Sequence, residues 1–119
     1  MSHIHLPHDH GQKMEEIISN IPDAERFLTL AEMFRQLSDG SRLRLFWLLC
    51  HCEECVINLS SLTEMSSPAV SHHLKKLRSA GLVVSRREGK EVYYKAADTP
   101  QSRTLHETIE RMLSITCPK

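Results

Sequence analysis

The stretch that most constrains the fold is residues 59–81, which read LSSLTEMSSPAVSHHLKKLRSAG. Leucines at helical spacing supply the apolar side of a short first helix, and residues 63–66 form a turn. A second helix begins at Ser66 or Ser67, because a serine hydroxyl accepts a hydrogen bond from a free backbone N–H and the following Pro68 already has a helical φ. The pattern therefore predicts a helix, a tight turn and a second helix.

The second helix has one apolar stripe and a polar, basic remainder. Val70, Leu74 and Leu77 follow one another at spacings of four and three, and Gly81 ends the helix. A helix with this layout fits the major groove of DNA, with its first turns at the base edges and its later basic side chains at phosphates. The predicted DNA contacts on this helix are Ser67, Ala69, Ser71, His72, His73, Lys75, Lys76 and Arg78. The alternative is an ordinary solvated surface helix.

Length and composition predict one globular domain, since the chain has 119 residues and 40% apolar content. Fifteen basic residues balance 15 acidic ones, so any attraction to nucleic acid depends on local charge. Residues 72–90 are locally basic and contain a single acid, Glu88. No apolar run approaches the ~20 residues of a membrane span, and no signal peptide is recognisable, which predicts a cytoplasmic protein.

Residues 1–13 are predicted to form a flexible arm ahead of a domain that spans residues 14–119. The arm has no apolar periodicity and is rich in histidine, with His3, His5, His8 and His10. Neutral imidazoles bind divalent ions such as Zn(II), Ni(II) or Co(II) when other ligands fix them. The histidines are therefore candidate metal ligands, with an incidental polar tail as the alternative.

Three further helices are predicted before the helix-turn-helix. The first covers about residues 14–19, and the second covers about residues 23–38. The third covers residues 42–51, begins at a Ser41 cap and is apolar on nearly its whole circumference, which predicts a buried helix. The second helix is expected to bury a stripe made of Phe27, Leu30, Ala31, Phe34 and Leu37.

A β-hairpin is predicted after Gly81, because two β-rich runs, residues 82–85 and 91–95, flank a polar turn that contains a glycine. Its basic side chains are candidate phosphate contacts beside the groove: Arg86, Arg87 and Lys90. A last helix runs from Pro100 to about Ile115 and has one apolar face. That face forms either a dimer contact or a contact within its own domain.

Three segments together resemble the ArsR/SmtB family of bacterial repressors: LSDGSRLRLFWLL, SSPAVSHHLKKLRSAGLV and RREGKEVYY. The resemblance covers about residues 24–115. It implies a mainly α-helical winged helix-turn-helix fold with a β-hairpin wing. It also implies a homodimer built on the first and last helices, which binds an inverted-repeat DNA operator and is released by an inducer, commonly a metal ion. Two recognition helices one turn of DNA apart would read the two half-sites.

The family's arsenic and cadmium sensors carry a Cys-x-Cys pair at the start of the helix before the turn. In this chain the first position is Cys55, but the second is Ile57, so the motif is half present. The sequence offers His51, Cys52 and Cys55 instead, a Cys-x-x-Cys spacing that can hold one ion. Together with one or two arm histidines, from the same subunit or from the other one, this set predicts a site for Zn(II), Cd(II) or Cu(I).

The family's other common site, a zinc site on the last helix, is predicted to be absent. Asp98 matches its start, but Pro100 and Arg111 occupy positions where ligands are expected. His106, Glu110 and Cys117 remain as isolated candidate ligands on or beyond that helix. The simpler interpretation is that these three residues are ordinary surface groups of an amphipathic helix.

Three alternatives to a metal-responsive repressor remain open: a repressor that senses oxidants, an enzyme and a protein-binding module. Cys50 follows an apolar run and is expected to be a small buried side chain. Cys52, Cys55 and Cys117 would sense oxidants or reactive sulfur if two of them closed a disulfide. A small thiol oxidoreductase is a distant alternative, because no βαβ pattern surrounds the Cys-x-x-Cys pair. The third alternative is a winged-helix module that binds protein rather than DNA. The favoured hypothesis is a non-enzymatic DNA-binding repressor.

Overall fold

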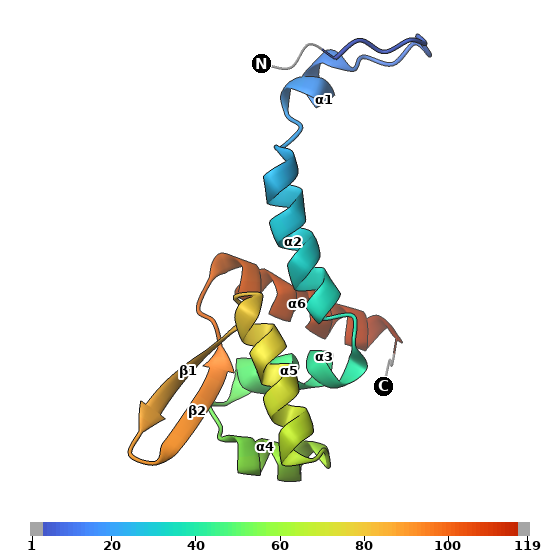
Figure 1. The fold of residues 1–119 in the computed structure, drawn as a ribbon. Coiled ribbons are helices and arrows are strands. Elements are labelled where there is room, and N and C mark those ends of the chain that lie inside the picture. Colours follow the sequence, from blue (N-terminus) through green and yellow to red (C-terminus); the bar gives the residue numbers. More distant parts are fainter. Residues whose placement is uncertain (1–3, 117–119) are drawn as a thin grey trace.

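The computed structural model describes residues 4–116, and it is mainly helical with one two-stranded antiparallel hairpin (Figure 1). The predicted fold class is confirmed. In chain order the elements are α1 Glu15–Ser19, α2 Ala24–Gln36, α3 Gly40–His51, α4 Val56–Thr63, α5 Ser67–Ser79, β1 Val83–Glu88, β2 Glu91–Ala96 and α6 Pro100–Thr116.

The helix-turn-helix is formed by α4 and α5, as the sequence predicts. Glu64 ends α4 in the left-handed conformation, with a φ of 59°, and so reverses the chain within the turn. The Ser66 hydroxyl accepts a hydrogen bond from the backbone N–H of Ala69, at 3.2 Å, and caps α5. Gly81 has a φ of 75°, a conformation that glycine adopts without steric cost, and leads the chain from α5 into the hairpin.

The hairpin joins β1 and β2 in the register Val83 to Ala96 and Glu88 to Glu91, with its turn at residues 89–90. A third backbone segment pairs with it. The loop between α3 and α4 forms a bridge in which Glu54 and Tyr94 exchange two backbone hydrogen bonds, at 3.0 and 2.9 Å. This bridge, which the sequence did not reveal, fixes the loop that contains Cys52 and Cys55 against the wing.

The core lies where α3 packs beneath α5. Leu45, Phe46 and Leu49 of α3 meet the predicted α5 stripe of Val70, Leu74 and Leu77, and all six are buried. The prediction that α3 is buried all round was wrong, because Leu43, Trp47 and Leu48 are only half-buried. The predicted Ser41 cap was also wrong. The Asp39 carboxylate accepts the hydrogen bond from the backbone N–H of Arg42, at 3.0 Å, so α3 begins at Gly40.

The apolar stripe predicted to be buried along α2 is mostly exposed, which corrects the sequence-based expectation. Phe27, Leu30 and Phe34 are 53, 42 and 54% exposed, Ala31 is exposed as well, and only Leu37 reaches the core. The physical reason is visible in Figure 1, where α2 projects from the body of the protomer and carries α1 at its far end. The stripe therefore has no cover within one protomer.

The apolar face of α6 is divided between the core and the surface. Leu105 is buried, and Ile109 packs against the core. Met112 and Leu113, on the same face, are 53 and 47% exposed. No helix within residues 4–116 has the length and apolar character needed to cross a membrane.

Candidate DNA interface and metal-ligating cluster

The recognition helix α5 is anchored by its buried stripe and presents its other faces outward. Because Val70, Leu74 and Leu77 are fully buried, the orientation of this helix is fixed. Most of the side chains predicted to contact DNA are exposed on it, namely Ser67, Ser71, His72, Lys75 and Arg78. Ala69, His73 and Lys76 are half-buried and lie at the edges of that surface.

His73 links the recognition helix to α3. Its Nδ1 lies 3.4 Å from Nη1 of Arg42, which also donates through Nε to the backbone carbonyl of Gln36. Partial burial lowers the pKa of His73, and the charge of Asp39 opposes this shift. The neutral imidazole is therefore favoured at this contact, so His73 supports α5 against the start of α3 as well as bordering the exposed face.

The basic side chains of the wing differ in their partners. Arg86 is held by two carboxylates, with Nη2 2.8 Å from Glu53 and Nη1 2.6 Å from Glu88, and its guanidinium lies over the Tyr93 ring. These carboxylates raise the pKa of Arg86 and neutralise its charge locally. Arg87 donates only a long hydrogen bond, 3.3 Å, to the carbonyl of Gly89 at the exposed hairpin tip. Arg87 is thus better placed than Arg86 to meet a phosphate.

The cysteines predicted to bind metal lie at the two ends of the loop between α3 and α4. Cys52 follows the last residue of α3, and its thiol donates to the carbonyl of Leu48 at 3.3 Å. Burial and the charge of Glu54 raise the pKa of Cys52. Cys55 is the N-cap residue of α4. Cys50, expected to be buried, is half-buried, and burial together with the charge of Glu110 raises its pKa to about 11.

The arm histidines lie apart from these cysteines in the protomer. The rings of His8 and His10 stack at a centroid distance of 5.8 Å, and their surroundings are residues of the arm itself and α1. His5 also belongs to the arm, whereas His3 and Cys117 lie outside the described residues. Asp98, the one residue that matched the family's zinc site on the last helix, forms an ion pair with Arg103.

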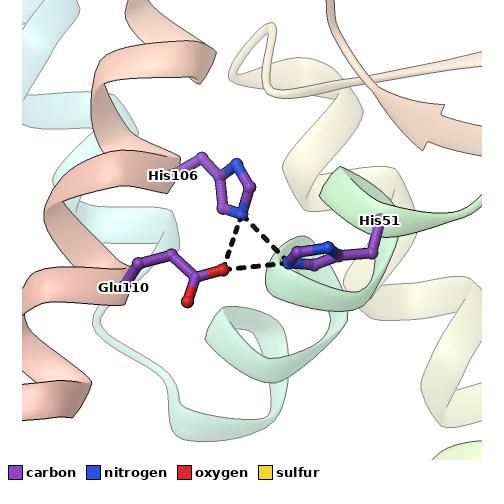
Figure 2. A group of neighbouring side chains, drawn as sticks. All are labelled: His51, His106 and Glu110. Atoms are coloured by element: carbon purple, nitrogen blue, oxygen red, sulfur yellow. Dashed lines mark hydrogen bonds and ion pairs between the residues drawn. The ribbon is translucent and has the colours of Figure 1, made fainter.

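The structure places His51 beside candidate ligands other than the cysteines predicted to accompany it. Within residues 4–116, a single group of three or more His, Cys, Asp or Glu side chains has all its ligand atoms within 4.8 Å of one another. It consists of His51 at the end of α3 with His106 and Glu110 of α6, whose side chains converge as Figure 2 shows. His106 and Glu110 appeared in the sequence only as isolated candidates.

The three ligand atoms of this cluster form a nearly equilateral triangle. Nε2 of His51 and Nε2 of His106 each lie 3.0 Å from Oε1 of Glu110, and the two nitrogens are 3.0 Å apart (Figure 2). The side chains are 45, 28 and 44% exposed for His51, His106 and Glu110. Hydrogen bonds from His51, His106 and Trp47 lower the pKa of Glu110, so its carboxylate is ionised at neutral pH.

Comparison with known proteins matches residues 39–85 to the family model described as "Bacterial regulatory protein, arsR family". The chain is 35% identical over 103 residues to a transcriptional repressor SmtB homolog from Synechocystis sp., in an alignment that covers 87% of this chain and 78% of the relative. The chain belongs to the ArsR/SmtB family. Members of the ArsR/SmtB family are DNA-binding transcriptional regulators, so the expectation of a non-enzymatic repressor is confirmed.

Two other known proteins are similar to the chain. A cadmium resistance regulatory protein, a CadC homolog from Staphylococcus aureus, is 36% identical over an alignment that covers 60% of this chain and 60% of the relative. The homodimeric winged helix-turn-helix DNA-binding domain Mb0332 from Mycobacterium bovis superimposes with a TM-score of 0.70 at 27% identity. That superposition covers 89% of this chain and 91% of the other.

Proposed function

We propose that this ArsR/SmtB protein is a homodimer that represses transcription from an inverted-repeat operator and loses affinity for it when a metal ion binds. The observation that carries the proposal is the exposed polar and basic face of α5, together with Arg87 at the wing tip, whose guanidinium donates only to the Gly89 carbonyl in the described structure. Residues of α5 read base edges, while Lys75, Lys76, Arg78, Arg87 and Lys90 meet phosphates. Arg86 belongs to the wing's internal ion pairs rather than to this set.

A dimer supplies the missing cover for the apolar faces of α2 and α6. Exposed apolar side chains gather on these two helices, namely Phe27, Leu28, Leu30, Phe34, Met112, Leu113 and Ile115. A surface cavity between the helices, lined by Phe34, Leu105 and Met112 among others, continues this apolar region. A two-fold interface on this surface pairs two α5 helices, and the two helices read successive half-sites when they lie about 34–36 Å apart.

Metal control is supported by the thiol and imidazole side chains that the chain offers as ligands, and by the relatives named for cadmium and arsenical resistance. The ligands Cys52 and Cys55, completed by His5, His8 or His10 from a partner's arm, remain one hypothesis for the site. Oxidation of these thiols is the weaker explanation. Reactive sensor cysteines have depressed pKa values, whereas the pKa of Cys52 is raised.

The test is a fluorescence anisotropy titration of labelled DNA from upstream of the protein's own coding sequence. The full chain is titrated alone and then with Zn(II), Cd(II), Ni(II), Co(II) or As(III). We expect at least one metal ion to weaken operator binding about 5–150-fold, the range of a 1–3 kcal/mol coupling. Operator affinity no greater than that for scrambled DNA would contradict the repressor assignment. Indifference to all of these ions, with release by an oxidant, would contradict metal control alone.

A further inference from the structure

The three short contacts among His51, His106 and Glu110 cannot all be hydrogen bonds at the same time. An ionised carboxylate only accepts hydrogen bonds, and a neutral imidazole Nε2 either donates or accepts. If both Nε2 atoms donate to Glu110, two donors face each other across 3.0 Å. If one Nε2 accepts from the other, its lone pair faces the carboxylate oxygen. One edge of the triangle is therefore repulsive in every neutral-histidine arrangement, and a cation between the three atoms would remove that repulsion.

The dimensions of the triangle fit a small transition metal ion. Zinc bonds to histidine nitrogen and carboxylate oxygen are roughly 2.0–2.2 Å long, so the ligand atoms of a tetrahedral site lie about 3.3–3.4 Å apart. The observed separations of 3.0 Å need to lengthen only slightly. Three protein ligands on one side of such an ion leave a fourth position for water or another donor.

The surroundings of the cluster supply the support that metal sites require. Nε1 of Trp47 donates to Oε1 of Glu110 at 3.2 Å, and the Trp47 ring packs on His51 at a centroid distance of 4.5 Å. Such outer contacts orient metal ligands. His51 is also the last residue of α3, where the helix dipole favours a cation. His51 and His106 line a surface cavity of about 360 Å³, through which an ion can enter.

We propose that His51, His106 and Glu110 form a binding site for a divalent transition metal ion of the Zn(II), Co(II) or Ni(II) class. Two imidazoles and a carboxylate suit these ions, whereas As(III) and Cu(I) prefer thiolates. The site deepens the proposed function and rests on it, because we assign to this ion the control of operator binding. Cys52, which lines the same surface cavity as His51 and His106, then does not ligate the ion, and neither does Cys55.

The position of the site explains how an ion there reaches the DNA-binding surface. The ion ties the end of α3 to α6, one of the two helices proposed to form the dimer. The opposite end of α3 contacts the recognition helix through Arg42 and His73, 3.4 Å apart. A helix of this kind transmits a shift along its length as a rigid element. A metal-induced change in the angle between α3 and α6 therefore changes the spacing of the two recognition helices.

The first test is metal binding by the full reduced chain, followed through the visible d–d absorption of Co(II) and by competition with Zn(II). Wild type should bind one Co(II) per chain at this site. Glu110→Gln and His106→Asn should weaken binding by more than the ~10–100-fold that loss of an outer contact costs. Glu107→Gln, an exposed carboxylate on the same helix, is the matched control and should bind Co(II) as wild type does. Equal thermal melting of the two glutamine variants separates ligand loss from unfolding.

Two results would overturn the site. One is Co(II) affinity that survives in both Glu110→Gln and His106→Asn. The other is a thiolate-to-cobalt charge-transfer band that disappears, together with the bound ion, in the Cys52→Ser/Cys55→Ser double variant. Operator release measured on the same proteins separates this inference from the proposed function. Release that persists in Glu110→Gln refutes control by this site and leaves metal control intact. Co(II) binding at the site without release in wild type refutes control of the operator by this site and leaves both the binding site and metal control through other ligands intact.

Discussion

The two adjacent arginines of the wing should differ in the salt dependence of DNA binding. Arg87→Ala removes one phosphate contact from each protomer, or two from the proposed dimer, because its guanidinium is held only by the 3.3 Å bond to Gly89. The slope of log Kobs against log salt is negative, and each lost phosphate contact makes it less steep by about 0.9. The slope of the variant should therefore be less steep than that of wild type by about 1.8. Between 50 and 200 mM salt, wild type should then lose about 12-fold more affinity than the variant does.

Arg86→Ala is the matched control for this experiment. Glu53 and Glu88 already neutralise Arg86, at 2.8 and 2.6 Å, so it releases few counterions on binding and its removal should leave the slope close to that of wild type. Fluorescence anisotropy at five or more salt concentrations measures both slopes, on operator and on unrelated DNA. Equal reductions for the two variants would show that the Arg86 ion pairs open on DNA, and would refute the reasoning.

Three further predictions concern stability and sequence readout. Leu74→Ala, at a fully buried position of α5, should lower the free energy of unfolding by about 2–5 kcal/mol in urea denaturation, and a loss below about 1 kcal/mol would contradict the packing described. Asp39→Ala should cost about 1 kcal/mol at pH 7 through loss of the α3 cap. The backbone N–H of Arg42 holds the pKa of Asp39 below its usual value, so the contribution is present above pH ~3.9 and is lost as the pH falls through the lower, folded-state pKa. The stability gap between Asp39→Ala and wild type should therefore narrow at acid pH, and an equal gap at pH 7 and pH 2 would contradict this. Ser71→Ala should relax operator choice and leave binding to unrelated DNA unchanged, as measured by competition between operator and scrambled DNA.

The parts of the fold that depend on local chemistry were predictable from the sequence. The Ser66 cap, the stripe of Val70, Leu74 and Leu77, and the glycine that follows α5 each act within a few residues of one another. Single-sequence patterns report such interactions well. The Ser41 cap failed for an equally local reason, since Asp39 lies two residues earlier and its carboxylate is also a good cap.

Contacts between distant segments were not predictable in the same way. The periodicity of Phe27, Leu30 and Phe34 reveals an apolar face, but it does not say whether that face is covered within the protomer or by a second one. His51 and Glu110 were each visible as possible ligands, yet only the packing of α3 against α6 brings them within 3.0 Å. The useful signal in the sequence was the spacing of four between His106 and Glu110, which places both side chains on one face of α6.

The bridge between Glu54 and Tyr94 makes the DNA-reading part of the protein a closed loop of chain. Residues 55–93, between its two ends, contain all of α4, all of α5 and β1. Contiguous segments that form one supersecondary motif often open as a single cooperative unit. The backbone amides of Glu54 and Tyr94 should therefore exchange with deuterium at the same rate as the core amides of α5. Equal exchange rates would mean that the recognition helix and the wing unfold and refold together, so that the two DNA-contacting elements are gained and lost as one unit.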